Sequence, residues 1–114
     1  MDTVQQLEQR REAILQQMRQ IRSMRTGSVS QQWLMVRHKA GPAVRRGPYY
    51  VLCRSEKGKT VSQRVPAGQV EQAKADVVAH KRFVDLCRQF ERLTEQLGQL
   101  ERAAGLGQEK KRRS

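Results

Sequence analysis

The chain has few aromatic residues and almost no cysteine, and both shortages limit what it can be. Aromatic residues make up 4% of its 114 residues, whereas charged residues make up 30%. Most of the buried apolar surface must therefore come from Leu, Val, Ile and Met. The two cysteines, Cys53 and Cys87, lie far apart, with no CxxC spacing and no cysteine–histidine cluster. We expect two reduced thiols rather than a disulfide or a metal site, and no cofactor.

Long apolar runs are also absent. No stretch approaches the roughly 20 apolar residues that a membrane-spanning helix needs, and the first residues, MDTVQQLEQRRE, are polar with no apolar signal region. The length suits one domain better than two. These features predict a cytoplasmic protein that has no membrane partner.

The sequence lacks the residue arrangements of common active sites. It has no Ser/His/Asp order, no paired carboxylates in a strand-end loop and no glycine-rich phosphate cradle. Gly58-Lys59-Thr60 resembles the end of a P-loop, but that motif requires glycine at position 53, which is Cys53. We therefore expect a protein that is not an enzyme and has no catalytic residue.

Acidic residues are scarce relative to basic ones, and the imbalance is local. The formal net charge is +12. Residues 1–28 carry +2, residues 29–66 carry +7, residues 67–104 carry zero and the segment from 105 carries +3. A uniformly basic surface would spread the excess over residues 67–104 as well. This distribution favours a polyanion-binding surface in the middle of the chain.

Apolar residues at alternating three- and four-residue steps predict two helices. The first spans residues 3–25, with Asp2 or Thr3 as its N-cap and Gly27 closing it. The second runs from Gln69 to about Ala104. Its early residues Val70 and Val77, with Val78 as a further candidate, are expected to cover a sheet. Its heptads are expected to pair with the first helix, and they consist of Ala79, Phe83, Leu86, Phe90, Leu93, Leu97, Leu100 and Ala104.

Between the helices, the composition predicts a three-stranded antiparallel sheet over about residues 29–66. The first strand lies within Ser28–His38, a basic loop follows over Lys39–Arg46, and a hairpin covers Gly47–Pro66. A bulged turn at Ser55–Gly58 would pair Ser55 with Lys59. That register places Cys53/Val61, Val51/Gln63 and Tyr49/Val65 on the apolar face, and Arg54/Thr60, Leu52/Ser62 and Tyr50/Arg64 on the opposite face.

The predicted fold class is therefore α+β, with an N-terminal helix, a three-stranded antiparallel sheet and a long C-terminal helix that forms an antiparallel hairpin with the first. Residues 1–104 form a single α-β-β-β-α domain in this prediction. Residues 105–114 form a disordered basic tail, in which Lys110–Arg113 could add a phosphate contact.

The basic sheet predicts nucleic-acid binding, with double-stranded DNA preferred to RNA. Tyr50, Arg54 and Arg64 would reach a groove, and the surrounding cations would contact phosphates. The candidate nucleic-acid-binding residues are Arg37, Lys39, Arg45, Arg46, Tyr50, Arg54, Lys57, Lys59 and Arg64.

Two alternatives remain open at this stage. The cations could serve only to keep a thin sheet in solution and to blunt its edges. The protein could also be an interaction module, in which Leu93, Leu97 and Leu100 of the long helix form a homodimer seam or dock on a larger protein, with the sheet as a cap.

Short motifs carry two resemblances. GPYY at 47–50, the turn with GKT at 58–60, and RVP at 64–66 leading into a long helix resemble a family of short, uncharacterised bacterial and archaeal proteins, some linked to mobile elements. Many members have a cysteine-rich segment before GPYY, but residues 37–46 here contain no cysteine, so no metal site is implied. The architecture also resembles the arm-type DNA-binding domains of tyrosine recombinases, without their catalytic residues. The resemblance to the uncharacterised family, some of whose members are linked to mobile elements, implies an accessory or regulatory factor of a mobile element.

Overall fold

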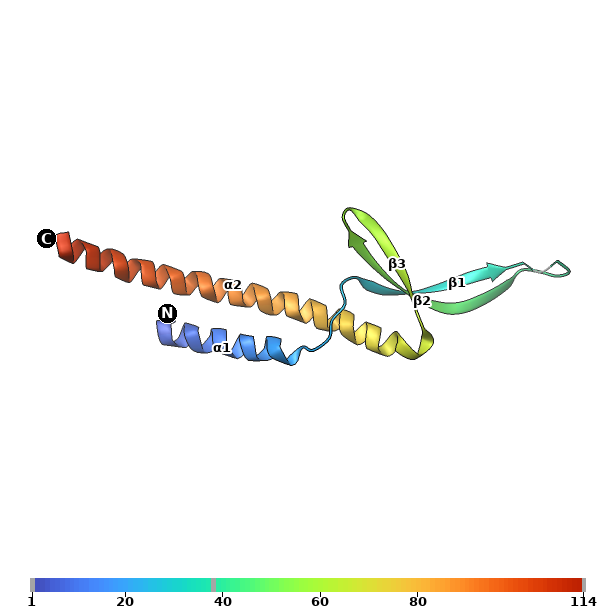
Figure 1. Ribbon diagram of the computed structural model, residues 1–114, viewed down its shortest axis with the longest axis horizontal. Coiled ribbons are helices and arrows are strands. Elements are labelled where there is room, and N and C mark those ends of the chain that lie inside the picture. Colours follow the sequence, from blue (N-terminus) through green and yellow to red (C-terminus); the bar gives the residue numbers. More distant parts are fainter. Residues whose placement is uncertain (1, 38, 114) are drawn as a thin grey trace. The chain divides into compact units, whose positions relative to one another are not determined.

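The computed structural model describes residues 2–37 and 39–113, with side chains described as far as Gly105. Its elements are α1 (Val4–Gln20), β1 (Ser28–Val36), β2 (Val44–Glu56), β3 (Lys59–Val65), a short 3-10 helix η1 (Ala67–Gln69) and α2 (Val70–Arg113). The sheet is antiparallel with the order β1-β2-β3 (Figure 1). The predicted α+β class is confirmed. The chain forms two compact units, a helical unit of residues 1–22 and 82–114 and a sheet unit of residues 23–81.

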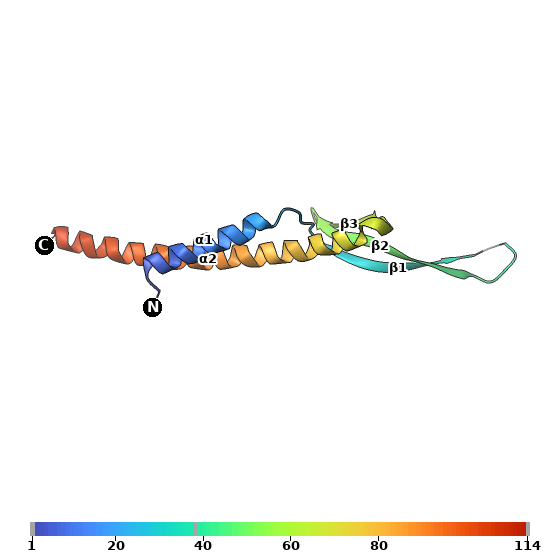
Figure 2. The same cartoon turned by 90° about the horizontal axis from the view of Figure 1, so that it is seen from below.

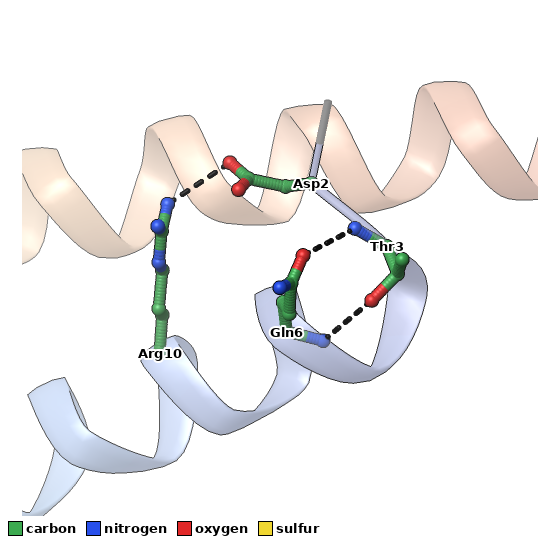
Figure 3. Close-up of polar contacts among 4 residues, drawn as sticks. All are labelled: Asp2, Thr3, Gln6 and Arg10. Carbon is green, nitrogen blue, oxygen red and sulfur yellow. Dashed lines mark hydrogen bonds and ion pairs between the residues drawn. The ribbon is translucent and has the colours of Figure 1, made fainter.

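The start of α1 is fixed by the side chain of Thr3. Its hydroxyl accepts a hydrogen bond from the Gln6 backbone N–H at 3.2 Å, and the Gln6 side-chain oxygen accepts one from the Thr3 backbone N–H at 2.9 Å. This reciprocal pair is a capping box, which satisfies two backbone donors that the first turn would otherwise leave unpaired. Asp2 lies beside it and pairs with Arg10 at 2.9 Å (Figure 3). Thr3 is therefore the N-cap, one of the two predicted candidates.

The end of α1 differs from the prediction. The helix ends at Gln20 instead of continuing to residue 25. The reason lies in the following segment, which is held by Asp76 of α2. Ser23 Oγ donates to the Asp76 carboxylate at 2.7 Å, and the Arg25 backbone N–H donates to the Asp76 carbonyl at 3.0 Å. The segment after Gln20 is non-helical where it makes these contacts with Asp76, and the apolar pattern of the first helix does not reveal such distant contacts.

Gly27 also has a different role from the predicted helix cap. It lies just before β1, with a φ of +112° that side-chain-bearing residues rarely adopt. A Cβ built at this position would collide with the carbonyl oxygen of Cys53 on β2. Glycine is therefore needed here because two backbones approach closely, and not because a helix ends.

The helical unit pairs α1 with the later part of α2 in antiparallel fashion. Arg82 donates to the side chain of Gln17 at 2.6 Å, and farther along Arg11 lies over the Phe90 ring, 4.8 Å from its centroid. The apolar stripes meet between these points, as the heptad spacing predicts. Among the residues of this unit whose side chains are described, four are buried, namely Leu7, Ile14, Leu86 and Leu97.

The predicted end of the second helix, near Ala104, is not where α2 ends. The helix continues to Arg113. The structure therefore has helix over residues 105–113, where the sequence predicted a disordered tail. The side chains of Lys110–Arg113 lie outside the described residues, so their phosphate contact stays a prediction.

The core of the sheet unit lies between one sheet face and the first turns of α2. Its buried members come from both layers and are Leu52, Val65, Val70, Ala73 and Val77, with Val29 and Tyr50 packed against them. The predicted use of Val70 and Val77 to cover the sheet is confirmed. Val78, the further candidate, is instead 64% exposed.

The β2–β3 register is displaced by one residue from the prediction. Glu56 pairs with Lys59 around a two-residue turn, and Cys53 pairs with Ser62 instead of Val61. Both turn residues have positive φ, 51° at Lys57 and 80° at Gly58, as a type I′ hairpin requires. Because side chains alternate, the one-residue slip moves every β2 residue to the opposite face. Leu52 consequently lies in the core instead of facing solvent.

Strand β2 begins earlier than predicted and forms a two-stranded ribbon with β1. The stretch Val44–Arg46, predicted as loop, pairs with Leu34–Val36, whereas β3 pairs with β2 only from Tyr50 onward. We call residues 32–36 together with 44–48 the ribbon. Figure 1 and Figure 2 both show β1 and β2 continuing together past the end of β3.

Asp76 generates a pH-dependent prediction. Hydrogen bonds from Ser23 and Gln72, together with the positive charge of Arg25, lower the pKa of Asp76 below its ordinary value despite the opposing effect of burial. A lowered folded-state pKa contributes stability above the unfolded-state pKa of about 3.9, and this contribution is lost as the pH falls through the folded-state pKa. We expect Asp76→Asn to lower the melting temperature at pH 7 and to flatten its decline below about pH 4, as followed by circular dichroism.

The matched control is Glu71→Gln, at a largely exposed acid on the same helix whose Lys74 partner is 3.8 Å away. It should leave both the melting temperature and its acid dependence close to those of the unchanged protein. Equal behaviour of the two variants would contradict the role given to Asp76.

The hairpin register can be tested by cross-linking. Cys53 Sγ and Ser62 Oγ lie 3.5 Å apart, close enough for the two positions to carry a disulfide. In a Cys87→Ser background, Ser62→Cys should lose both thiols on mild oxidation, as measured by thiol titration. Val61→Cys should keep its thiols, since Val61 pairs with Arg54. The reverse result would restore the register predicted from sequence.

Candidate nucleic-acid interface

The nine predicted binding residues lie in three places on the sheet unit. At the far end of the ribbon lies the ribbon cluster, which consists of Arg37, Lys39, Arg45 and Arg46. Around the β2–β3 turn lies the turn cluster, which consists of Arg54, Lys57 and Lys59. The remaining two, Tyr50 and Arg64, lie where all three strands meet.

Tyr50 is wrongly predicted as a groove-facing residue. It pairs with Val65 and packs against the core on the α2 side of the sheet, with the Lys74 ammonium 5.3 Å from its ring centroid. Arg54 is four residues farther along the same strand, and because side chains alternate it lies on the same face of the sheet as Tyr50. The one-residue register shift accounts for both corrections.

Arg64 keeps its predicted outward orientation. It pairs with Val51 on the sheet face opposite Leu52, and its guanidinium lies over the ring of Tyr49 at 4.0 Å. The predicted trio of Tyr50, Arg54 and Arg64 is thus divided between the two faces of the sheet. No single flat surface holds all three side chains.

The turn cluster combines one paired and two exposed cations. Arg54 lies 3.6 Å from Glu56, and both side chains are about half exposed, so the ion pair is weak. Lys57 occupies the turn itself and Lys59 begins β3, and both are exposed. The turn therefore presents positive charge to solvent.

The ribbon cluster is positioned by pairing across the two strands. Arg45 lies opposite Met35 and its guanidinium stacks over the Trp33 ring at 4.0 Å. Arg46 lies opposite Leu34, on the other side of the ribbon because neighbouring residues of a strand alternate. Each side of the ribbon therefore carries an arginine next to apolar side chains.

The apolar side chains beside these arginines are exposed, which the sequence did not predict. Trp33 is 44% exposed, Leu34 51%, Met35 66% and Val44 45%. Their hydrophobic character predicted a strand with a covered face, yet neither β3 nor the core of the sheet unit reaches them. Their exposure could not be predicted, because hydrophobicity alone does not indicate which apolar residues other parts of the chain will cover.

Gly47 holds the aromatic part of the ribbon in place. A Cβ at this position, where φ is +140°, would lie 3.0 Å from both the Gln32 carbonyl oxygen and the Trp33 ring. The pairing is irregular between Gln32 and Leu34, opposite the Gly47-Pro48 step. The glycine therefore leaves room for the indole to lie close over the neighbouring strand.

Negative charge is nearly absent from this region. No Asp or Glu occurs from Ala13 to Ser55. The sheet unit holds eleven Lys or Arg and three acids, a net charge of +8. Among the described residues, the Arg54–Glu56 contact is the single ion pair that involves a cation of the strands or their turns. The surface potential here is consequently positive.

The turn and ribbon clusters are separated by the length of β2. This strand has 13 residues, and at about 3.3 Å per residue its ends can be as much as roughly 40 Å apart. The candidate interface is therefore two basic regions at opposite ends of one strand instead of one compact patch.

Other kinds of site find little support in the described residues. Among the side chains that the structure describes, those of residues 2–37 and 39–105, no group of three His, Cys, Asp or Glu is arranged to hold a metal ion. Over the same residues, neither helix combines the length and the hydrophobicity that crossing a bilayer requires.

Comparison with known proteins gives one match. A family model described as a domain of unknown function, DUF6788, matches residues 4–75, which include α1, the whole sheet and the start of α2. No curated protein and no solved structure matches the chain. The likeness to recombinase arm domains accordingly stays a hypothesis about architecture. The chain belongs to the DUF6788 family, whose function is uncharacterised.

Proposed function

We propose that this protein binds double-stranded DNA through the basic residues of its sheet unit. The observation that carries the proposal is the charge of that unit, +8 over residues 23–81, with a single acid, Glu56, on its strands and turns. A cation surface without local counter-charges attracts a polyanion, and binding releases the counterions that surround it.

The exposed apolar residues argue against a role for the cations in solubility alone. A surface selected to stay in solution would not place Trp33, Leu34 and Met35 among its arginines. Duplex DNA offers partners for both kinds of side chain, since its phosphates attract cations and its grooves present apolar groups such as the thymine methyl.

The shape of the basic region favours DNA over RNA. A two-stranded ribbon can enter the major groove of B-form DNA, which is about 12 Å wide. The major groove of an RNA duplex is deep and too narrow for side chains to read. Tighter binding of an RNA duplex than of a DNA duplex of the same sequence would contradict this choice.

Assembly through the long helix stays an untested alternative. The three leucines in the proposed dimer seam are not exposed, because Leu97 is buried and Leu93 and Leu100 are half-buried within the helical unit. A partner on this surface would gain limited apolar area from them, so the helical pair gives less support to a binding role than the sheet does.

Salt dependence tests the proposal directly. Fluorescence anisotropy with a labelled duplex over a salt series should give a linear fall of log affinity with log salt. We expect Arg37→Ala with Lys39→Ala, two exposed cations at the far end of the ribbon, to reduce the slope by about 2, since each lost phosphate contact removes about 0.9.

The matched control is Arg19→Ala with Arg88→Ala, which removes the same charge from exposed positions of the helical unit. Its slope should equal that of the unchanged protein. An equal reduction in both double variants would mean that only the overall charge matters, and absence of salt-dependent binding would reject DNA as the ligand.

A role as an accessory or regulatory factor of a mobile element is a further hypothesis. It predicts that genes encoding this chain lie beside a transposase or recombinase gene more often than chance allows, which a survey of gene neighbourhoods would measure. Regular placement within ribosomal operons would instead favour RNA.

A further inference from the structure

We infer that the ribbon is the element that enters a groove of duplex DNA, and that its Trp33, Met35 and Arg45 side contacts the bases. This inference rests on the proposed function and specifies which surface performs it. The opposite side, with Leu34, Arg46 and Val44, would face away from the bases.

No other strand of the sheet unit pairs with the ribbon, and the core of that unit does not cover it. Beyond Tyr50 it has no third strand, and the core cluster against α2 is formed from the other half of the sheet. Three consecutive apolar residues, Trp33 to Met35, are each more than two-fifths exposed there. Exposed apolar area of this kind, rimmed by cations, is typical of an interaction surface.

The two sides of the ribbon differ in what they offer a ligand. Among the large apolar side chains that the structure describes as exposed, Met35 is the most exposed and Trp33 is the largest. Arg45 is held over the indole ring at 4.0 Å, so its planar guanidinium is already ordered before any ligand arrives. Preorganisation of this kind lowers the entropy cost of binding. On the other side, Arg46 makes no such stacking contact among the described residues.

The chemistry of the ribbon favours a nucleic acid over other partners. Its cluster of four cations has no acid nearby in the sequence, which matches an anionic ligand. Its outer strand edges carry unpaired backbone donors and acceptors, which a hydrocarbon environment would leave unsatisfied. Within a DNA groove, these backbone groups can bond to phosphate and sugar oxygens.

The first experiment compares single substitutions on the two sides of the ribbon. We expect Met35→Ser to weaken duplex binding about fivefold to tenfold with an unchanged salt slope, because it removes an apolar contact and no phosphate contact. Leu34→Ser is the matched control, since it makes a comparable change at the neighbouring, similarly exposed position. It should alter affinity less than about twofold. Circular dichroism would verify that both variants keep the fold.

The second experiment uses Trp33 as a reporter, because it is the single tryptophan of the chain. Titration with unlabelled duplex should change its emission, and the change should saturate at the same duplex concentration as the anisotropy signal. The control is Val78→Ser, which removes from α2 an apolar side chain about as exposed as Met35. It should leave both the Trp33 emission titration and the anisotropy titration unchanged.

The outcomes separate this inference from the proposed function. Salt-dependent binding with unchanged Trp33 emission, or equal effects of Met35→Ser and Leu34→Ser, would overturn the ribbon assignment and leave DNA binding intact. If Leu34→Ser weakened duplex binding and Met35→Ser did not, the base-contacting side would be the one with Leu34, and the inference would also be overturned. Absence of duplex binding, with a Trp33 response to anionic lipid vesicles or to an acidic protein instead, would reject both proposals.

Discussion

Packing of one sheet face on the first turns of α2 determines where the other side chains of the sheet unit lie. Leu52 and Val65 can be buried against Val70, Ala73 and Val77 in a single register of the hairpin. That register alternates the remaining residues between the two faces. The charged surface is therefore a consequence of which apolar residues are covered, and a change in the core would rearrange this surface without replacing any arginine.

Charge and stability are linked in this unit. A net charge of +8 with few ion pairs means that the folded sheet unit bears its own electrostatic repulsion. Binding of a polyanion would relieve this repulsion, and mass action would then stabilise the folded state. The Asp76 network opposes the repulsion locally, because it places a carboxylate where Arg25 and the linker before β1 meet α2.

The sequence was sufficient for the elements that depend on local pattern. Periodicity predicted both helices and their antiparallel pairing, and the start of α1 was narrowed to a cap by Asp2 or Thr3. The sequence was insufficient for features that tertiary contacts determine. The end of α1 depends on Asp76, far along the chain, and the hairpin register depends on a positive φ at Lys57, a residue type that rarely adopts it. The exposed ribbon could not be predicted because its apolar residues look like those of a covered strand.

Two close approaches beside β1, each at a glycine, restrict how this fold can vary. Gly27 lies against the Cys53 carbonyl just before the strand, and Gly47 lies beneath the Trp33 ring across from it. A side chain at either position would be strained, because φ is +112° at Gly27 and +140° at Gly47 and the added Cβ would crowd the neighbouring strand. If the proposed ligand were lost, the arginine-bearing positions would be free to change, whereas these two glycines would still be required by the fold. Relatives that had lost the proposed ligand could still be recognised by the two glycines.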